Sequence, residues 1–130
     1  VQELAVQEEQ ALRVLLVDDH DDMLDMMNLL LTRRSYSVIT ANSGHKALEV
    51  AQSFAPHIVV SDIGMPEMNG YEMMTRLRAM PQLSPFKAIA LTGYDVQEDQ
   101  ENVRAAGFDA HLTKPIDFDQ LFSIISKLTS

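Results

Sequence analysis

Short apolar runs alternate with longer helix-like segments about five times along this chain. We expect the runs to be strands, because short uninterrupted apolar stretches are typical of strands that are buried on both faces of a sheet. The expected strands are residues 13–17, 37–41, 58–61, 88–91 and 110–113. The expected helices follow them at residues 23–34, 43–54, 71–80, 96–106 and 117–128.

Strands separated by helices of this length form right-handed β-α-β units, which build a parallel sheet with helices on both faces. The chain is therefore predicted to fold as an α/β sandwich with three layers. In open sheets of this class, ligands bind beyond the carboxyl ends of the strands. Four of the expected strands end next to polar residues, which are predicted to gather at that edge: Asp18 with Asp19, Asp62, Thr92, and Lys114.

The composition of the chain limits its domain count and argues against several classes of partner. The chain has 130 residues, enough for one domain with a real core. Its formal net charge of −9 argues against direct binding to nucleic acid, which depends on clustered Lys and Arg. The absence of cysteine excludes disulfides and fits a reducing, cytoplasmic compartment. No apolar stretch approaches the length of a membrane span, so no membrane contact is expected. Residues 1–12 are interpreted as a leader or linker before a domain over residues 13–130.

The residues at the expected sheet edge suit phosphoryl transfer. Asp18, Asp19 and Asp62 would repel one another unless a cation shared the site, and Mg²⁺ prefers such hard oxygen ligands. Asp62 follows a separate strand and precedes a glycine-containing loop, so it is the candidate nucleophile for an aspartyl phosphate. Lys114 would neutralise the charge of an incoming phosphoryl group, and the Thr92 hydroxyl would donate a hydrogen bond to it.

The residues around these positions resemble a known family. The stretches LLVDDHDD, VVSDIGMPEMNGYEM, IALTGY and HLTKP occur in this order and at the expected element ends. Together they are similar to the receiver domain of two-component response regulators, and the similarity spans residues 13–128. The resemblance implies a flavodoxin-like fold, with five parallel strands in the order 2-1-3-4-5 and five helices. The IALTGY and GFDAHLTKP stretches are most similar to receivers of hybrid sensor histidine kinases.

The resemblance also implies a role for each site residue. Asp62 would accept a phosphoryl group from a phosphohistidine on a histidine kinase or a histidine phosphotransfer domain. Mg²⁺ would be held by Asp18, Asp19 and Asp62, with the backbone carbonyl of Gly64 completing the protein ligands. The catalytic residues would be Asp62, Thr92 and Lys114.

Three further expectations concern the neighbours of Thr92 and Lys114. The Lys114–Pro115 peptide bond is expected to be cis. Many receivers carry an aromatic switch residue three positions before the lysine, where this chain has His111. A pH-sensitive switch at His111 is therefore left open. Tyr94 is large enough to shield a phosphoryl group from water.

Two other functions are considered. A Mg²⁺-dependent phosphatase with an aspartyl nucleophile would carry a second acid two residues beyond Asp62, where this chain has Gly64. A non-signalling interaction module would not need the complete set of pocket residues.

The first expected helix carries more apolar residues than one buried stripe needs. Its surplus is interpreted as a broad core contact. The alternative is a docking strip for a helical partner, formed by His20, Leu24 and a neighbouring Met or Leu. Asp21 and Asp22 are expected to cap this helix. His20, His45 and His57 show no metal-ligand spacing and are interpreted as surface or boundary residues.

Overall fold

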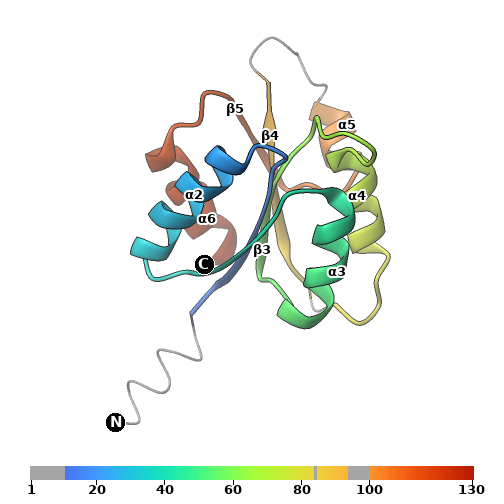
Figure 1. Ribbon diagram of the computed structural model, residues 1–130, viewed down its shortest axis with the longest axis horizontal. Helices are drawn as coiled ribbons and strands as arrows, with labels where there is room; N and C mark the ends of the chain where they lie inside the picture. The colour runs from blue at the N-terminus through green and yellow to red at the C-terminus, as the bar shows by residue number, and fades with distance from the viewer. Residues whose placement is uncertain (1–10, 84, 94–99) are drawn as a thin grey trace.

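A computed structural model describes residues 11–83, 85–93 and 100–130 of the chain. Its centre is a parallel sheet of five strands in the order β2-β1-β3-β4-β5 (Figure 1). The strands are β1 (Arg13–Val17), β2 (Ser37–Ala41), β3 (Ile58–Asp62), β4 (Lys87–Thr92) and β5 (Ala110–Thr113). This order confirms the predicted topology.

Five helices cover the sheet within the described residues. They are α2 (Asp21–Arg33), α3 (Gly44–Phe54), α4 (Gly70–Arg78), α5 (Gln100–Ala105) and α6 (Phe118–Thr129). Helices α2 and α6 lie on one face, and α3, α4 and α5 lie on the other (Figure 1). The predicted helix over residues 96–106 is described from Gln100 onward, and its residues 96–99 lie outside the described part. Residues 1–10 of the predicted leader lie outside it as well.

Each face of the sheet packs into its own core. Along β1, Val14 and Leu16 point towards α2 and α6, whereas Leu15 and Val17 point towards α3 and α4. All four side chains are fully buried. Successive residues of a strand face opposite sides of the sheet, so a strand with helices on both sides must be apolar throughout. This explains why the runs in the sequence are uninterrupted.

Three helices begin at a residue whose side chain caps the first turn. The hydroxyl of Ser43 accepts a hydrogen bond from the Lys46 backbone N–H at the start of α3. The side chain of Asn69 caps α4, and that of Asp117 caps α6, in the same way. Such contacts satisfy backbone donors that a first turn otherwise leaves free.

Helix α2 begins differently from the prediction. Its N-cap residue is His20, whose side chain makes no capping hydrogen bond, and Asp21 and Asp22 lie inside the first turn. The expectation that they cap the helix was therefore wrong, because the helix starts two residues earlier than predicted. Both carboxylates still lie at the positive end of the helix dipole.

The apolar surplus of α2 is divided between core and solvent. Leu24 is buried at 4% exposure and belongs to the core, which supports the interpretation of a broad core contact and argues against the alternative of a docking strip through Leu24. Of the apolar side chains of α2, those of Met26 and Leu29 are the exposed ones. Among the described residues, no helix is long and apolar enough to cross a bilayer.

Candidate functional site

The carboxyl ends of β1 and β3 bring the first acidic side chains together. These two strands are neighbours, with Val17 beside Ser61 in the register, so Asp18 emerges next to Asp62. The backbone N–H of Asp18 donates to the Ala41 carbonyl at 3.2 Å and so extends the ladder towards β2. Asp18 is fully buried and Asp62 is 5% exposed. The strand register therefore places two buried carboxylates side by side.

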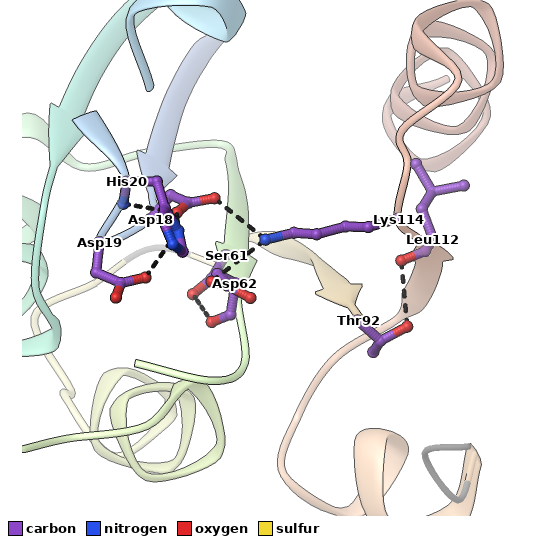
Figure 2. A network of polar contacts seen from close by, with 8 residues as sticks. All are labelled: Asp18, Asp19, His20, Ser61, Asp62, Thr92, Leu112 and Lys114. Carbon is purple, nitrogen blue, oxygen red and sulfur yellow. Dashed lines mark hydrogen bonds and ion pairs between the residues drawn. The ribbon is translucent and has the colours of Figure 1, made fainter. Parts of the chain in front are cut away.

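Lys114, which follows the edge strand β5, also reaches these carboxylates. Its Nζ lies 3.4 Å from Asp62 Oδ2 and 3.6 Å from Asp18 Oδ2. Figure 2 shows the extended lysine side chain pointing at both acids. The Lys114 backbone N–H donates to the Thr92 carbonyl at 2.7 Å, and the Lys114–Pro115 bond is cis, as expected. The ammonium thus supplies positive charge between two acids that would otherwise repel each other.

Burial raises the pKa of the Asp62 carboxyl above its usual value, because a desolvated carboxylate loses the hydration of its charge. The ammonium of Lys114 opposes this effect, and the charge of Asp18 adds to it. A nucleophilic carboxylate must be ionised, so Lys114 supports the reactive form of Asp62. A bound divalent cation would act in the same direction.

His20 also belongs to this cluster, a role that was not predicted from its sequence. The Nδ1 atom of His20 lies 3.0 Å from Asp18 Oδ1 and 3.3 Å from Asp19 Oδ1. The His20 backbone N–H also donates to Asp18 Oδ1, at 2.9 Å. The hydrogen bond to Asp18, followed by the charges of Asp19 and Asp18, raises the pKa of His20. The ring is a surface residue, as predicted, but its position directly after two acids was the clue to its contact with them.

Thr92 and Gly64 reach the same edge of the sheet without joining the cluster. The buried hydroxyl of Thr92 donates to the Leu112 carbonyl at 3.3 Å, and Figure 2 shows it apart from the acids. Gly64 is exposed in the loop after β3, and a side chain there would meet nothing within 4 Å. The site is therefore open on the side of this loop.

The acidic side chains form a set of donors suited to a metal ion. Asp18, Asp19, His20 and Asp62 each offer one ligand atom, and these atoms all lie within 4.8 Å of one another. Within the described part of the chain, two buried oxygens of this set, Asp18 Oδ2 and Asp19 Oδ1, have no hydrogen-bond partner. Carboxylate oxygens gathered in this way fit the preference of Mg²⁺ for hard ligands.

The structure describes His111 but not Tyr94. His111 lies on β5 beside Ala90 of β4 and is half-buried. The prediction for Tyr94 concerns a residue outside the described part of the chain. The role of His111 as a switch stays a prediction.

Known proteins resemble this chain over nearly its full length. A family model described as the response regulator receiver domain matches residues 14–126. A protein of Leptolyngbya boryana, described as an uncharacterized 14.6 kDa protein in the sodA1 3′ region, is 35% identical over 114 residues, covering 88% of this chain and 87% of that protein. The polar-differentiation response regulator DivK of Brucella ovis is 29% identical over 112 residues, covering 86% of this chain and 91% of DivK.

Solved structures agree with these sequence matches. The chemotaxis response regulator CheY4 of Vibrio cholerae has a TM-score of 0.84 and 28% identity, covering 92% of this chain and 99% of that one. The receiver domain of a signal transduction histidine kinase from Syntrophus aciditrophicus has a TM-score of 0.79 and 27% identity, covering 91% of this chain and 89% of that one.

Proposed function

This chain belongs to the response regulator receiver domain family of two-component signalling, and we propose that Asp62 is its phosphoacceptor. Receiver domains bind Mg²⁺ at an acidic pocket and interact with histidine kinases or phosphotransfer proteins. The proposed donor is a phosphohistidine on such a partner. The observation that carries the proposal is the convergence of Asp62, Asp18 and Lys114 within hydrogen-bonding or ion-pair distance at one edge of the sheet.

In the proposed reaction, a carboxylate oxygen of Asp62 attacks the phosphorus of the phosphohistidine. The new P–O bond forms as the P–N bond breaks, and the electron pair of that bond returns to the imidazole of the donor. Positioning and charge stabilisation supply most of the catalysis in such transfers. Asp62 is suited to the attack because it ends β3 beside an open loop and is paired with a cation.

Lys114 and Thr92 are the proposed partners of the transferred group. The Lys114 ammonium already faces Asp62, so it would neutralise a phosphoryl oxygen there without a large movement. The Thr92 hydroxyl now donates to the Leu112 carbonyl and would have to turn from it to reach a phosphoryl oxygen. This change of partner is the proposed origin of a conformational response, since Leu112 lies on β5.

We propose that Asp18, Asp19 and Asp62 hold Mg²⁺ together with the backbone carbonyl of Gly64. When bound, the ion would offset the negative charge of the carboxylates and of the phosphoryl group. The buried oxygens Asp18 Oδ2 and Asp19 Oδ1, which take part in ion pairs but accept no hydrogen bond within the described residues, support this assignment. Asp18 is fully buried, so its charge depends on neighbouring cations for compensation.

The proposal is tested by incubating the protein with Mg²⁺ and a small phosphodonor such as acetyl phosphate. We expect a mass increase of one phosphoryl group that is absent after chelation of the metal and absent in Asp62→Asn. Asp22→Asn, an exposed acid of the same charge type, is the matched control and should be phosphorylated normally. Unchanged phosphorylation of Asp62→Asn would place the acceptor elsewhere.

The same assay separates the two alternatives. A phosphatase would release many equivalents of phosphate per protein, and an interaction module would gain no phosphoryl group at all.

We further propose that the receiver unit spans residues 13–130, preceded by a leader or linker, and works in the cytoplasm. The family match over residues 14–126 and the absence of cysteine support these two proposals.

A further inference from the structure

We propose that the imidazole of His57 is an acid-sensitive clasp, which fastens the start of β1 to the start of β3 while the ring is neutral and releases it when the ring is protonated. The clasp lies where these two strands begin, at the end of the sheet opposite Asp18 and Asp62. It concerns how the chain enters the sheet and does not depend on phosphorylation of Asp62.

The first backbone N–H of β1 is bonded to a side chain. The Arg13 N–H donates to His57 Nδ1 at 3.0 Å, and the His57 backbone N–H donates to the Arg13 carbonyl at 2.9 Å. The ring is half-buried between the two strands. The two residues therefore exchange a pair of hydrogen bonds, and one of the pair ends on a titratable nitrogen.

This hydrogen bond requires a neutral imidazole. A backbone N–H can only donate, so His57 Nδ1 has to be the accepting nitrogen, with the ring hydrogen on Nε2. A protonated ring carries a hydrogen on both nitrogens and would turn a donor towards the Arg13 N–H. The ring would then have to rotate away, and the Arg13 N–H would lose its partner.

The backbone of His57 is held from both sides, so its ring is the part that can respond. The Lys87 backbone N–H donates to the His57 carbonyl at 2.9 Å, opposite the bond to the Arg13 carbonyl. The entry to β1 is also held to β2, because the Ser37 N–H donates to the Leu12 carbonyl at 2.8 Å. Protonation of the ring should therefore loosen the β3 side of this entry and leave the rest of the ladder in place.

The charges around His57 oppose its protonation. The Arg13 Nε donates to the Ala55 carbonyl at 2.9 Å, so a fixed guanidinium occupies the carbonyl end of α3, which would otherwise favour a cation. Strand β4 contributes the positive Lys87, and the last turn of α3, residues 51–54, carries no charged residue. Partial burial, followed by the charge of Arg13, lowers the pKa of His57 below its ordinary value of 6.5.

Acid should weaken the clasp and the fold together. Because the pKa of His57 is lower in the folded protein than in the unfolded chain, the unfolded chain takes up the proton first. The stabilisation by His57 is therefore complete above pH 6.5 and is lost as the pH falls through the lowered pKa. The raised pKa of His20 has the opposite effect on stability, so the contribution of His57 has to be measured as a difference between variants.

The test compares variants that differ in what they place at the position of His57 Nδ1. His57→Asn keeps an acceptor oxygen for the Arg13 N–H but cannot titrate, and His57→Ala removes the acceptor. His45→Asn is the matched control, because His45 is an exposed histidine of α3. In the complete ¹⁵N-labelled chain, NMR measures the ¹⁵N shifts of the His57 ring and the hydrogen-exchange protection factor of the Arg13 amide, from about pH 7.5 to about pH 5. Urea unfolding at the same pH values measures stability.

We expect the parent to show an unprotonated Nδ1 at neutral pH and an Arg13 protection factor that falls about tenfold on acidification. His45→Asn should behave like the parent, whereas His57→Asn should keep its protection throughout and His57→Ala should lack it throughout. The urea midpoint of the parent should fall relative to that of His57→Asn as the pH is lowered.

Three results would overturn the proposal: a hydrogen on Nδ1 of the parent at neutral pH, an Arg13 protection factor that does not change with pH, or the same loss of protection in His57→Asn as in the parent. If His57→Ala does not fold, the ring shifts and the comparison of the parent with His57→Asn still decide the outcome. No phosphodonor enters this test, so its result is separate from that for the phosphorylation of Asp62.

Discussion

Lys114 Nζ lies 3.4 Å from Asp62 Oδ2, although β4 separates the strand that ends at Asp62 from the strand that Lys114 follows. The lysine follows β5 and its extended side chain crosses the end of β4 to reach β3 (Figure 2). The contact joins the proposed nucleophile to the strand on which His111 and Leu112 lie. A change in the charge of Asp62 therefore alters its ion pair with Lys114, the residue that directly follows β5.

The first prediction concerns the stability cost of an ionised Asp62. Burial raises its pKa in the folded protein, so the folded state holds a proton over a pH range in which the unfolded chain has released it. The free energy of unfolding therefore falls as the pH rises through this range. Asp62→Asn removes the effect and should stabilise the metal-free protein by about 1 kcal/mol at neutral pH.

Urea unfolding at a series of pH values measures this difference. The gap between Asp62→Asn and the parent should shrink on acidification and close below the ordinary carboxyl pKa of 3.8. Asp22→Asn should show no such pattern, because Asp22 is exposed in the first turn of α2. A gap that widens on acidification would contradict the assignment of burial as the dominant cause.

The second prediction concerns the stabilisation of the fold by Mg²⁺. An ion that binds only the folded state adds about 2.7 kcal/mol to the free energy of unfolding at one hundred times its dissociation constant. Asp19→Asn should require about tenfold more Mg²⁺ for the same effect, because Asp19 would lose its charge and one ligand oxygen. Thermal unfolding in a series of MgCl₂ concentrations, compared with NaCl at equal ionic strength, measures the Mg²⁺ concentration that each variant requires.

Asp22→Asn is again the matched control and should respond to Mg²⁺ like the parent. Equal Mg²⁺ dependence of Asp19→Asn and Asp22→Asn would show that the ion screens the net charge of −9 without occupying a site.

The sheet and its acidic edge were predictable because both follow from local sequence patterns. Four uninterrupted apolar residues such as Val14 to Val17 have to be buried on both faces, and parallel strands bring their carboxyl ends together. The gathering of Asp18, Asp62 and Lys114 at one edge follows from this rule, whereas the strand order that makes β1 and β3 neighbours was implied by the family resemblance. Their separation in sequence does not matter, because the register places strand ends and not sequence neighbours in contact.

What the sequence did not predict depends on side-chain direction. His20 turns to Asp18 because its own backbone N–H binds the same carboxylate oxygen, a local geometry that no periodicity reveals. Leu24 and Met26 are equally apolar, yet the docking of α2 on the sheet buries the first and exposes the second. The hydroxyl of Thr92 was expected to face a phosphoryl group, and the structure shows it bound to the Leu112 carbonyl.

The third prediction concerns Arg78, which connects α4 to the residues just before β4 and β5, at the end of the sheet remote from the acids. Its guanidinium donates to the Phe86 carbonyl at 2.7 Å and twice to the Gly107 carbonyl, at 2.7 and 3.0 Å. It also pairs with Asp109 at 3.1 Å and lies 4.0 Å above the Phe86 ring. Losing these contacts should lower the free energy of unfolding by about 2 kcal/mol.

Arg78→Lys should not restore this stability, because an ammonium lacks the planar fork that reaches several acceptors at once. Arg76→Lys is the matched control, since Arg76 is exposed and pairs only weakly with Glu72 on the same helix, and it should cost less than about 0.5 kcal/mol. Phosphorylation by acetyl phosphate should be normal in both variants. Recovery of full stability by Arg78→Lys would show that charge alone accounts for the role of Arg78.

The last prediction concerns Gly70, the first residue of α4, which packs against the strand end that carries Asp62. A Cβ atom at this position would lie 2.4 Å from the Asp62 carbonyl oxygen and 2.9 Å from Ile63 Cα. Both are backbone atoms of the turn that leaves β3, and the Gly70 N–H binds the Ile63 carbonyl at 2.8 Å. The added methyl group therefore cannot be accommodated by turning a side chain.

Gly70→Ala should lower the free energy of unfolding by about 2 kcal/mol, because the backbone after β3 has to move. The same movement displaces Asp62 from Lys114, so phosphorylation by acetyl phosphate should slow as well. Gly64→Ala is the matched control for stability, because its Cβ would meet nothing within 4 Å, and its unfolding free energy should change by less than about 0.5 kcal/mol. Equal stabilities of the two variants would mean that the turn after β3 yields freely, and the close packing of Gly70 would then not be what positions Asp62.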